Sequence, residues 1–344
     1  MFSIFLPVAA TAENVPFSDS RWEFAGEKTE VTTHAGREAL LIQNGRAMLA
    51  DADFENGVIE FDVQVTPERG FHGVFWRLHE GGNGENFYIR SHQSGNEDAN
   101  QYTPLVNRLT AWQLYFGPRF SAPTVYRFGE WLPVKIVVSG DAADIYVDSV
   151  EPVLHIADLK HAAVAGPLML SSAFAPAYFS NFRYEKRDGL EMAGKGAPPP
   201  SLEPGTVLEW EVSQPFDEAA LANTASLSPA HLEGLTWQPL AAEEKGYANL
   251  SWVTPFAEGA NTVFARIRIS SAEESVRFIR FGYSDRVKVF LNGELLYSGD
   301  NGYQSRDYRY LGTIGLFDEV PLHLRAGVNE LVFAVSESFG GWGI

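Results

Sequence analysis

The feature that most constrains this chain is a succession of short runs with strand periodicity between Trp22 and Tyr184. Apolar and polar residues alternate within the runs, while Gly, Asn, Asp and Pro separate them, and helical periodicity is nearly absent. Such alternation is typical of strands that are buried on one face. The predicted strands span 58–65, 73–78, 86–92, 112–116, 131–139, 144–147, 166–171 and 178–184. We therefore expect an all-β sandwich.

A second β domain is predicted after a linker. Residues 188–205 are rich in Pro and Gly, with three consecutive prolines at 198–200, and such a segment forms neither a strand nor a long helix. Beyond it, strands are expected at 248–253, 263–270, 276–283 and 329–336, with a helix-like piece at 217–223. Asn292 and Gly293 join two alternating runs as a type I′ hairpin turn would. We expect a sandwich over 13–187, a linker over 188–205 and a jelly roll over 206–344.

Length and charge exclude several classes of protein. With 344 residues the chain exceeds what one core usually serves. Its 44 acidic and 26 basic residues give a net charge of −18, which repels nucleic acids and anionic membranes. It has no cysteine, which excludes disulfides, thiolate metal sites and a cysteine nucleophile. No apolar run approaches the length of a membrane span. We therefore expect neither a nucleic-acid partner nor a membrane span, and the oligomeric state is left open.

The N-terminus predicts export. Residues 1–12 hold a short apolar run that ends in Ala10, Thr11 and Ala12, a small-residue pattern typical of a signal-peptide cleavage site, although a basic n-region is missing. We interpret the segment as a truncated signal peptide and expect a bacterial protein that is periplasmic or secreted. The alternative is an apolar tail that packs against the first domain.

Both halves resemble families of β-sandwich modules. Residues 20–185 resemble the concanavalin A-like lectin/glucanase sandwich, especially its laminin-G-like and family 16-like members, through NGVIEFDVQV, GVFWRL, ENFYIRSHQSG and FSNFRYE. Residues 205–340 resemble the galactose-binding-like jelly roll through RVKVFLNGELLYSG and AGVNELVFAVSE. The resemblance implies two β-sandwich (jelly-roll) domains, and it implies architecture without activity.

Sorting the predicted strands by face gives a candidate glycan-binding groove. Ile59, Phe61 and Val63 are expected to face the core, and Glu60 and Asp62 the opposite side. If the neighbouring strands meet in one sheet, six further side chains line the same groove: Arg77, Tyr88, Arg90, His92, Gln113 and Tyr115. Such groups can hydrogen-bond sugar hydroxyls and stack on sugar rings, so an oligo- or polysaccharide is the expected partner. The alternative is a solvated face with cross-strand ion pairs.

A glycoside hydrolase is the alternative function. Family 16 enzymes carry E-x-D-x-x-E on one strand; Glu60 and Asp62 match its first two acidic positions, but Val65 occupies the third. Glycosidases need two carboxyl groups that flank the scissile bond. We therefore favour non-catalytic binding, with catalysis at Glu60 and Asp62 as the alternative and a protein-interaction module as a second one.

Metal and second-domain sites are weaker candidates. No pair of His residues has the spacing of a zinc site. Asn96 and Asp98, in the polar loop 94–101, are candidate ligands of a structural calcium ion, and the alternative is an ordinary polar loop. In the second domain, Trp342 is either an interface plug or a stacking platform.

Overall fold

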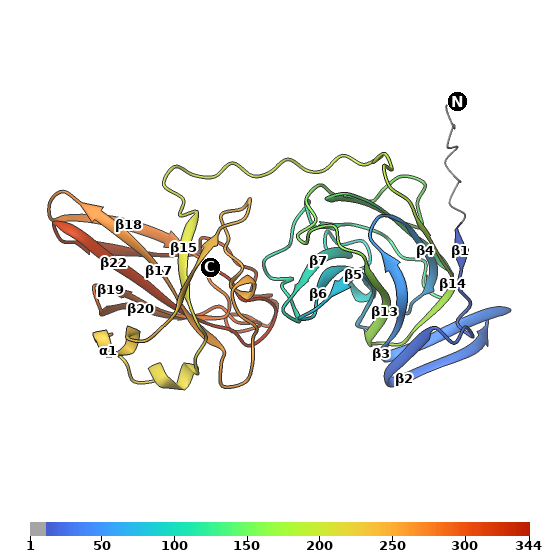
Figure 1. The fold of residues 1–344 in the computed structure, drawn as a ribbon, viewed down its shortest axis with the longest axis horizontal. Coiled ribbons are helices and arrows are strands. Elements are labelled where there is room, and N and C mark those ends of the chain that lie inside the picture. The colour runs from blue at the N-terminus through green and yellow to red at the C-terminus, as the bar shows by residue number, and fades with distance from the viewer. Residues whose placement is uncertain (1–11) are drawn as a thin grey trace, which may run out of the picture. The chain divides into compact units, whose positions relative to one another are not determined.

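The computed structural model describes residues 12–344, so all but the last residue of the predicted signal peptide lies outside the described residues. The fold is all-β, as predicted, and consists of two β-sandwich units (Figure 1). One unit comprises Met1–Pro104 and Phe116–Pro198, and the other comprises Leu105–Tyr115 and Pro199–Ile344. In the described chain, no helix is long and apolar enough to cross a membrane.

The first unit is one curled antiparallel sheet. Its strand order is β12-β11-β10-β4-β14-β3-β13-β5-β6-β7, with β1 beside β14, β2 beside β3 and β9 beside β7. The strands are β1 (Glu13–Asn14), β2 (Trp22–His34), β3 (Arg37–Phe54), β4 (Gly57–Gln64), β5 (Gly70–His79), β6 (Asn83–Arg90), β7 (Asn100–Val106), β9 (Ser121–Ala122), β10 (Leu132–Ser139), β11 (Ala142–Val147), β12 (Leu154–Ile156), β13 (Gly166–Phe174) and β14 (Ala177–Lys186). A 3-10 turn, η1 (Ser91–Gln93), follows β6.

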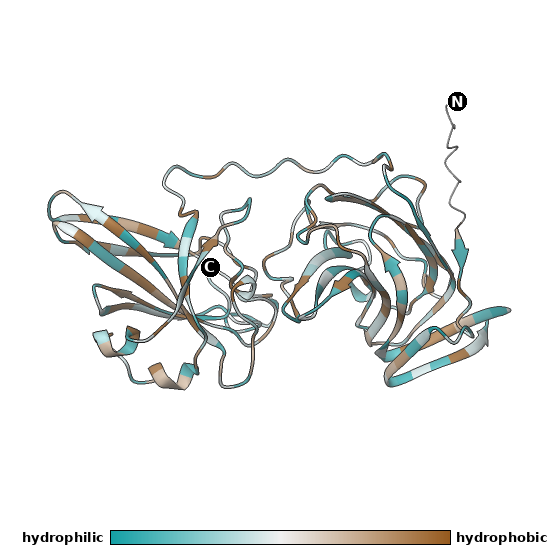
Figure 2. Cartoon of the chain, in the orientation of Figure 1, coloured by the Kyte–Doolittle hydropathy of each residue, from teal (hydrophilic) through white to brown (hydrophobic). Residues whose placement is uncertain are grey.

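The sheet turns at β3 to make two layers. The first half of β3 pairs with β14, where Leu41 lies opposite Tyr178, and its second half pairs with β13, where Leu49 lies opposite Leu168. One layer is therefore β12-β11-β10-β4-β14, and the other is β13-β5-β6-β7. Apolar and polar residues alternate along many of the strands, as the brown and teal bands of Figure 2 show. Such alternation sends one side of a strand into the core.

The strand faces on β4 were predicted correctly. Ile59, Phe61 and Val63 are buried, whereas Glu60 and Asp62 lie on the outer surface of their layer. On β5 and β6, Val74, Trp76 and Phe87 are buried in the same way.

The second unit is a six-stranded sheet and a two-stranded sheet. Their orders are β16-β15-β17-β22-β19-β20 and β18-β21. The elements are β15 (Glu209–Ser213), η2 (Glu218–Leu221), α1 (Pro229–Leu232), β16 (Trp237–Ala241), η3 (Leu250–Trp252), β17 (Thr262–Ser271), β18 (Ser275–Phe281), β19 (Arg286–Leu291), β20 (Glu294–Asp300), β21 (Asp318–Leu324) and β22 (Gly327–Ser336). Asn292 and Gly293 both have positive φ, 50° and 90°, as the predicted type I′ turn requires. Trp342 is fully buried in the core of this unit, where its Nε1 donates to the Val335 carbonyl.

Two predicted strands are wrong. Residues 248–253 contain the 3-10 turn η3, in which the Asn249 side chain accepts from the Ser251 amide. Residues 112–116 follow β8 (Leu109–Thr110) as a turn, because Leu114 and Tyr115 both donate their amides to the Ala111 carbonyl. Local hydrogen bonding of this kind competes with a strand ladder.

The second unit is discontinuous in sequence, because 105–115 belongs to it. Gln113 alone makes four hydrogen bonds there. Its amide donates to the Gly340 carbonyl and its carbonyl accepts from the Ile314 amide, while its side chain donates to the Leu311 carbonyl and accepts from Ser284 Oγ. We predicted 105–115 as part of the first domain, because no local feature of the sequence marks this segment as part of the second unit.

Candidate functional site

The structure does not bring the predicted groove residues together. Glu60 and Asp62 lie on β4, in one layer, and Tyr88, Arg90 and His92 lie on β6 and η1, in the other. Because the inner sides of both layers are buried, these two groups occupy opposite outer surfaces of the first unit. The expected single groove is therefore two separate surfaces.

We call the first surface the β6 face: Arg69, Phe71, Asn86, Tyr88, Arg90, His92 and Phe174. Its centre is the Phe71 ring on β5. The ring centroids of Tyr88, His92 and Phe174 lie 5.9, 5.3 and 5.7 Å from that of Phe71. Gly73 makes room for this packing, because a Cβ there would lie 2.8 Å from the Cβ of Tyr88. The aromatic rings and the strands beneath them thus form one continuous platform.

Phe174 is the exposed edge of the platform. Its side chain is 55% exposed, and its backbone has a φ of 65°, a left-handed conformation that is rare for a bulky residue. The Asn44 side chain fixes this conformation by accepting from the Phe174 amide at 2.8 Å. Strained backbone of this kind is concentrated at functional sites. Packing within the chain does not explain why this apolar ring is exposed to solvent.

Three buried polar atoms on the β6 face have no hydrogen-bond partner: Asn86 Oδ1, Arg90 Nε and His92 Nδ1. Leaving a buried polar group unpaired costs about 1–3 kcal/mol, so such atoms call for an explanation. Several further atoms of this kind lie elsewhere in the described chain, and two of them, on Trp76 and Arg77 of β5, belong to side chains that are fully buried. The β6 face therefore combines buried polar atoms that lack hydrogen-bond partners with the exposed aromatic carbon of Phe174.

The charges of the β6 face are mainly positive. Arg90 pairs with Asp98 through Nη1, and the Arg69 guanidinium lies 4.9 Å from the Phe174 ring centroid and 6.0 Å from that of Phe71. Burial, and then the charges of Arg90 and Arg69, lower the pKa of His92 below its usual value. His92 is therefore neutral at pH 7, and Nδ1 can donate or accept according to its tautomer.

We call the second surface the β4 face: Arg37, Glu60, Asp62, Lys135, Tyr146, Asn181 and Arg183. It contains a cavity of about 740 Å³, which most of these residues line. Asp62 accepts from Arg37 at 2.6 Å and from Asn181 at 2.7 Å, and Glu60 accepts from Arg183 at 2.6 Å. The hydrogen bond to Glu60 raises the pKa of Arg183. Lys135 Nζ lies 3.8 Å from the Tyr146 ring centroid. Both carboxylates on this face are already paired with cations.

The β4 face does not have the arrangement of a glycosidase. Its two carboxylates, Glu60 and Asp62, come from one strand and lie on the same side of the cavity. Of the described residues that line the cavity, none supplies a third carboxylate. Hydrolysis needs carboxyl groups on both sides of the scissile bond. This one-sided arrangement therefore offers no acid and base that flank a substrate.

The remaining predicted groove residues are structural. Arg77 is fully buried and donates to the Glu55 carbonyl, to Asn56 Oδ1 and to the Gly140 carbonyl, so it ties two loops together. Gln113 and Tyr115 lie in the second unit, where the Tyr115 hydroxyl contacts Glu243 and Asn249. Burial raises the pKa of Tyr115 well above its ordinary value.

The predicted calcium ligands face other partners. Asp98 pairs with Arg90, and Asn96 donates to the Gln93 side chain at 2.6 Å. Over the described part of the chain, no group of three or more His, Asp or Glu side chains is arranged to hold a metal ion.

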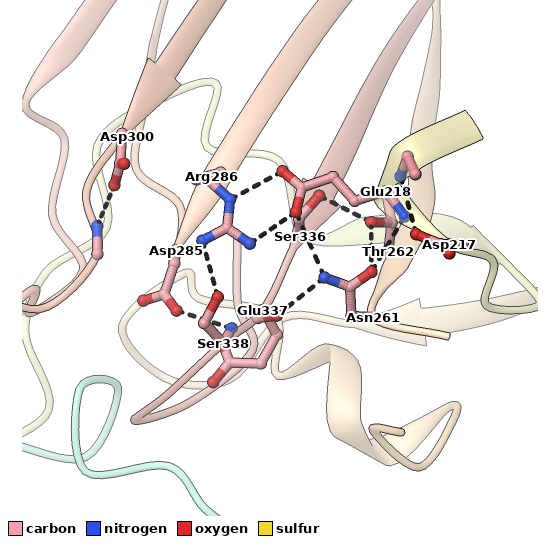
Figure 3. A network of polar contacts seen from close by, with 12 residues as sticks. Asp217, Glu218, Asn261, Thr262, Asp285, Arg286, Asp300, Ser336, Glu337 and Ser338 are labelled. Atoms are coloured by element: carbon pink, nitrogen blue, oxygen red, sulfur yellow. Dashed lines mark hydrogen bonds and ion pairs between the residues drawn. The ribbon is translucent and has the colours of Figure 1, made fainter. Parts of the chain in front are cut away.

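The second unit has a cavity of about 1000 Å³ between η2 and the strands β19, β20 and β22. Figure 3 shows its polar network: Arg286 donates to both carboxylate oxygens of Glu218 at 2.8 and 2.7 Å and to Ser338 Oγ at 2.7 Å. Asn261 Oδ1 accepts from the Glu218 amide at 3.1 Å, and Thr262 and Ser336 share a hydrogen bond of 2.8 Å. These bonds fasten η2 to the sheet.

Sequence reasoning missed four residues of the β6 face: Arg69, Phe71, Asn86 and Phe174. Phe71 sits two residues before the predicted start of its strand, so its place on the polar face of β5 was overlooked. The signal that could have found it is the period of two, which puts Phe71, Gly73 and Phe75 on one side. For Phe174 and Arg69 no local signal exists, because their contact depends on the pairing of β13 with β5.

Comparison with known proteins does not identify a family: no family model and no curated protein matches the chain. Among solved structures, the carbohydrate-binding module CBM66 from Bacillus subtilis is 16% identical, with a TM-score of 0.38 over 48% of this chain and 96% of that one. A Bacillus licheniformis beta-glucanase is 12% identical, with a TM-score of 0.37 over 53% of this chain and 100% of that one. A native glycosidic hydrolase is 13% identical, with a TM-score of 0.39 over 54% and 100%. At these scores, the function has to be argued from the side chains.

Proposed function

We propose that the protein binds glycans through the β6 face of its first unit. The observation that carries the proposal is the combination of three unpaired buried polar atoms with an aromatic cluster whose edge, Phe174, is exposed. Sugars present hydroxyls that donate and accept hydrogen bonds, together with C–H faces that stack on aromatic rings. A saccharide over Phe71 and Phe174 would place its hydroxyls beside Arg90 Nε and His92 Nδ1. This pairing would relieve the cost of leaving these atoms unsatisfied.

Binding without catalysis is the function that the geometry favours. Asp98, the carboxylate that pairs with Arg90, occupies one end of the platform. On the β4 face, Glu60 and Asp62 share one wall and are held by Arg183 and by Arg37 with Asn181. Export to the periplasm or medium remains a proposal that rests on residues 1–12 of the sequence.

A glycan array followed by isothermal titration tests this proposal. Phe174→Ala is the informative variant, because an exposed side chain can be removed without disturbing the core. We expect it to weaken saccharide binding by about tenfold or more, in line with the loss of one stacking contact. Arg183→Gln, on the β4 face, is the matched control and should bind as the unmodified chain does. Binding that survives Phe174→Ala and fails in Arg183→Gln would move the site to the β4 face.

A further inference from the structure

The β6 face gathers positive charge in a protein whose net charge is −18. Arg69 and Arg90 both lie close to the Phe71 ring, at 6.0 and 5.8 Å from its centroid. Asp98 pairs with Arg90, so two cations and one carboxylate lie at this face. The surface thus has a net positive charge where a ligand would lie.

Arg69 is the cation of the β6 face that has no ion-pair partner among the described residues. Its residue is exposed, and across the described chain its guanidinium makes no ion pair or side-chain hydrogen bond with the protein. Stacking on Phe174 at 4.9 Å and a hydrogen bond from the Ala175 amide to the Arg69 carbonyl hold it at the edge of the platform. A guanidinium that is oriented in advance loses less entropy when it binds an anion.

The guanidinium of Arg90 has partners for only some of its N–H donors. Asp98 occupies its Nη1, and Nε has no partner. Guanidinium groups bind carboxylates and sulfates through two parallel N–H donors, and such charge-assisted bonds are about twice as strong as neutral ones. A neutral hydroxyl could satisfy Arg90 Nε, but it would leave the charge of Arg69 without a counterion.

We propose that the glycan bound at the β6 face is acidic, with a carboxylate or sulfate group that pairs with Arg69 while a sugar ring stacks on Phe71 and Phe174. This inference rests on the proposed function, because it names the class of saccharide that the same surface would take. A long polyanion such as a nucleic acid is disfavoured by the charge of −18, whereas a single acidic group beside Arg69 is not.

The test is titration of the full chain with matched saccharides of one backbone: the neutral oligomer, its uronate form and its sulfated form. The backbone is chosen from a glycan array, and an oligonucleotide of similar length is included. We expect at least one acidic form to bind about tenfold more tightly than the neutral form. This difference in affinity should become smaller as the salt concentration is raised. The difference in affinity between the acidic and the neutral form should disappear in Arg69→Gln and should remain in Arg183→Gln. The stronger of the two acidic ligands then identifies carboxylate or sulfate as the group recognised.

Two results would overturn the inference and leave the proposed function standing. One is equal or tighter binding of the neutral form that still depends on Phe174, and the other is a preference for acidic sugars that Arg69→Gln does not change. Oligonucleotide binding that matches the best saccharide would also contradict it. If no saccharide on the array binds, the proposed function itself fails.

Discussion

The two outer surfaces of the first unit have similar composition, but they differ in how completely their polar side chains are hydrogen-bonded. Each contains guanidinium groups, an amide and at least one aromatic ring; carboxylates lie on the β4 face, and Asp98 pairs with Arg90 beside the β6 face. On the β4 face, Glu60 and Asp62 are held by cations and an amide at 2.6–2.7 Å. On the β6 face, Asn86, Arg90 and His92 each keep an unpaired buried atom. Composition alone therefore does not distinguish the two surfaces, whereas hydrogen-bond satisfaction does.

The cavity of the second unit differs from the β6 face only in degree, because one of its lining atoms, the buried Glu337 Oε2, also has no hydrogen-bond partner. That cavity is lined by charged groups, but Arg286, Glu218 and Asn261 bind one another. The β6 face differs by combining three such atoms with an exposed aromatic ring, that of Phe174.

The largest expected effect comes from removing the centre of the platform. Phe71→Ala takes away the ring that Tyr88, His92 and Phe174 contact, so we expect saccharide affinity to fall by at least about 2 kcal/mol, or roughly 30-fold. Titration calorimetry measures the change, with circular dichroism as the check on folding. An unchanged affinity in a folded variant would remove the distinction between the two faces.

A second prediction concerns the core beneath the β6 face. His72 is buried, bonds to Ser172 and Ser91, and has a pKa lowered to about 3 by burial. Because the folded state keeps His72 neutral while the unfolded state protonates it below pH 6.5, stability falls as the pH drops from 6.5 towards 3. The free energy of unfolding should therefore fall by about 2 kcal/mol more between pH 7 and 5 in the unmodified chain than in His72→Gln. Urea unfolding at both pH values checks this, and parallel losses in the two proteins would contradict it.

A third prediction separates Gln113 from the glycan site. Gln113→Ala leaves Ser284 and the Leu311 carbonyl without their side-chain partner, so the second unit should lose about 1–2 kcal/mol of stability. Hydrogen exchange of peptides that cover 311–314 should become faster, while saccharide affinity stays the same. A loss of affinity without faster exchange would return Gln113 to the binding surface.

The smallest effect is expected on the β4 face. In the double variant Glu60→Gln, Asp62→Asn the paired groups are partly exposed, so the stability loss should be at most about 1 kcal/mol. Saccharide affinity should not change. Hydrolysis of polysaccharide by the unmodified chain, lost in this variant, would support the enzyme interpretation instead.

How far the sequence predicts the structure depends on the range of the interactions involved. The period of two correctly placed Glu60 and Asp62 outside and Phe61 inside, because strand alternation is a local property. It could not place β4 and β6 in different layers, since β4 pairs with β10 and β14, which are distant in sequence. The segment 112–116 has the composition of a strand, but local hydrogen bonds to the Ala111 carbonyl, together with contacts to Gly340 and Leu311, give it a turn conformation.

The most direct test of the account is a crystal structure of the full chain with the best saccharide from the array. We predict that a sugar ring lies over Phe71 and Phe174, with ligand oxygens within hydrogen-bond distance of Arg90 Nε and His92 Nδ1. A saccharide bound instead beside Lys135 and Tyr146, or in the cavity of the second unit, would contradict the claim that the unpaired polar atoms mark the binding surface.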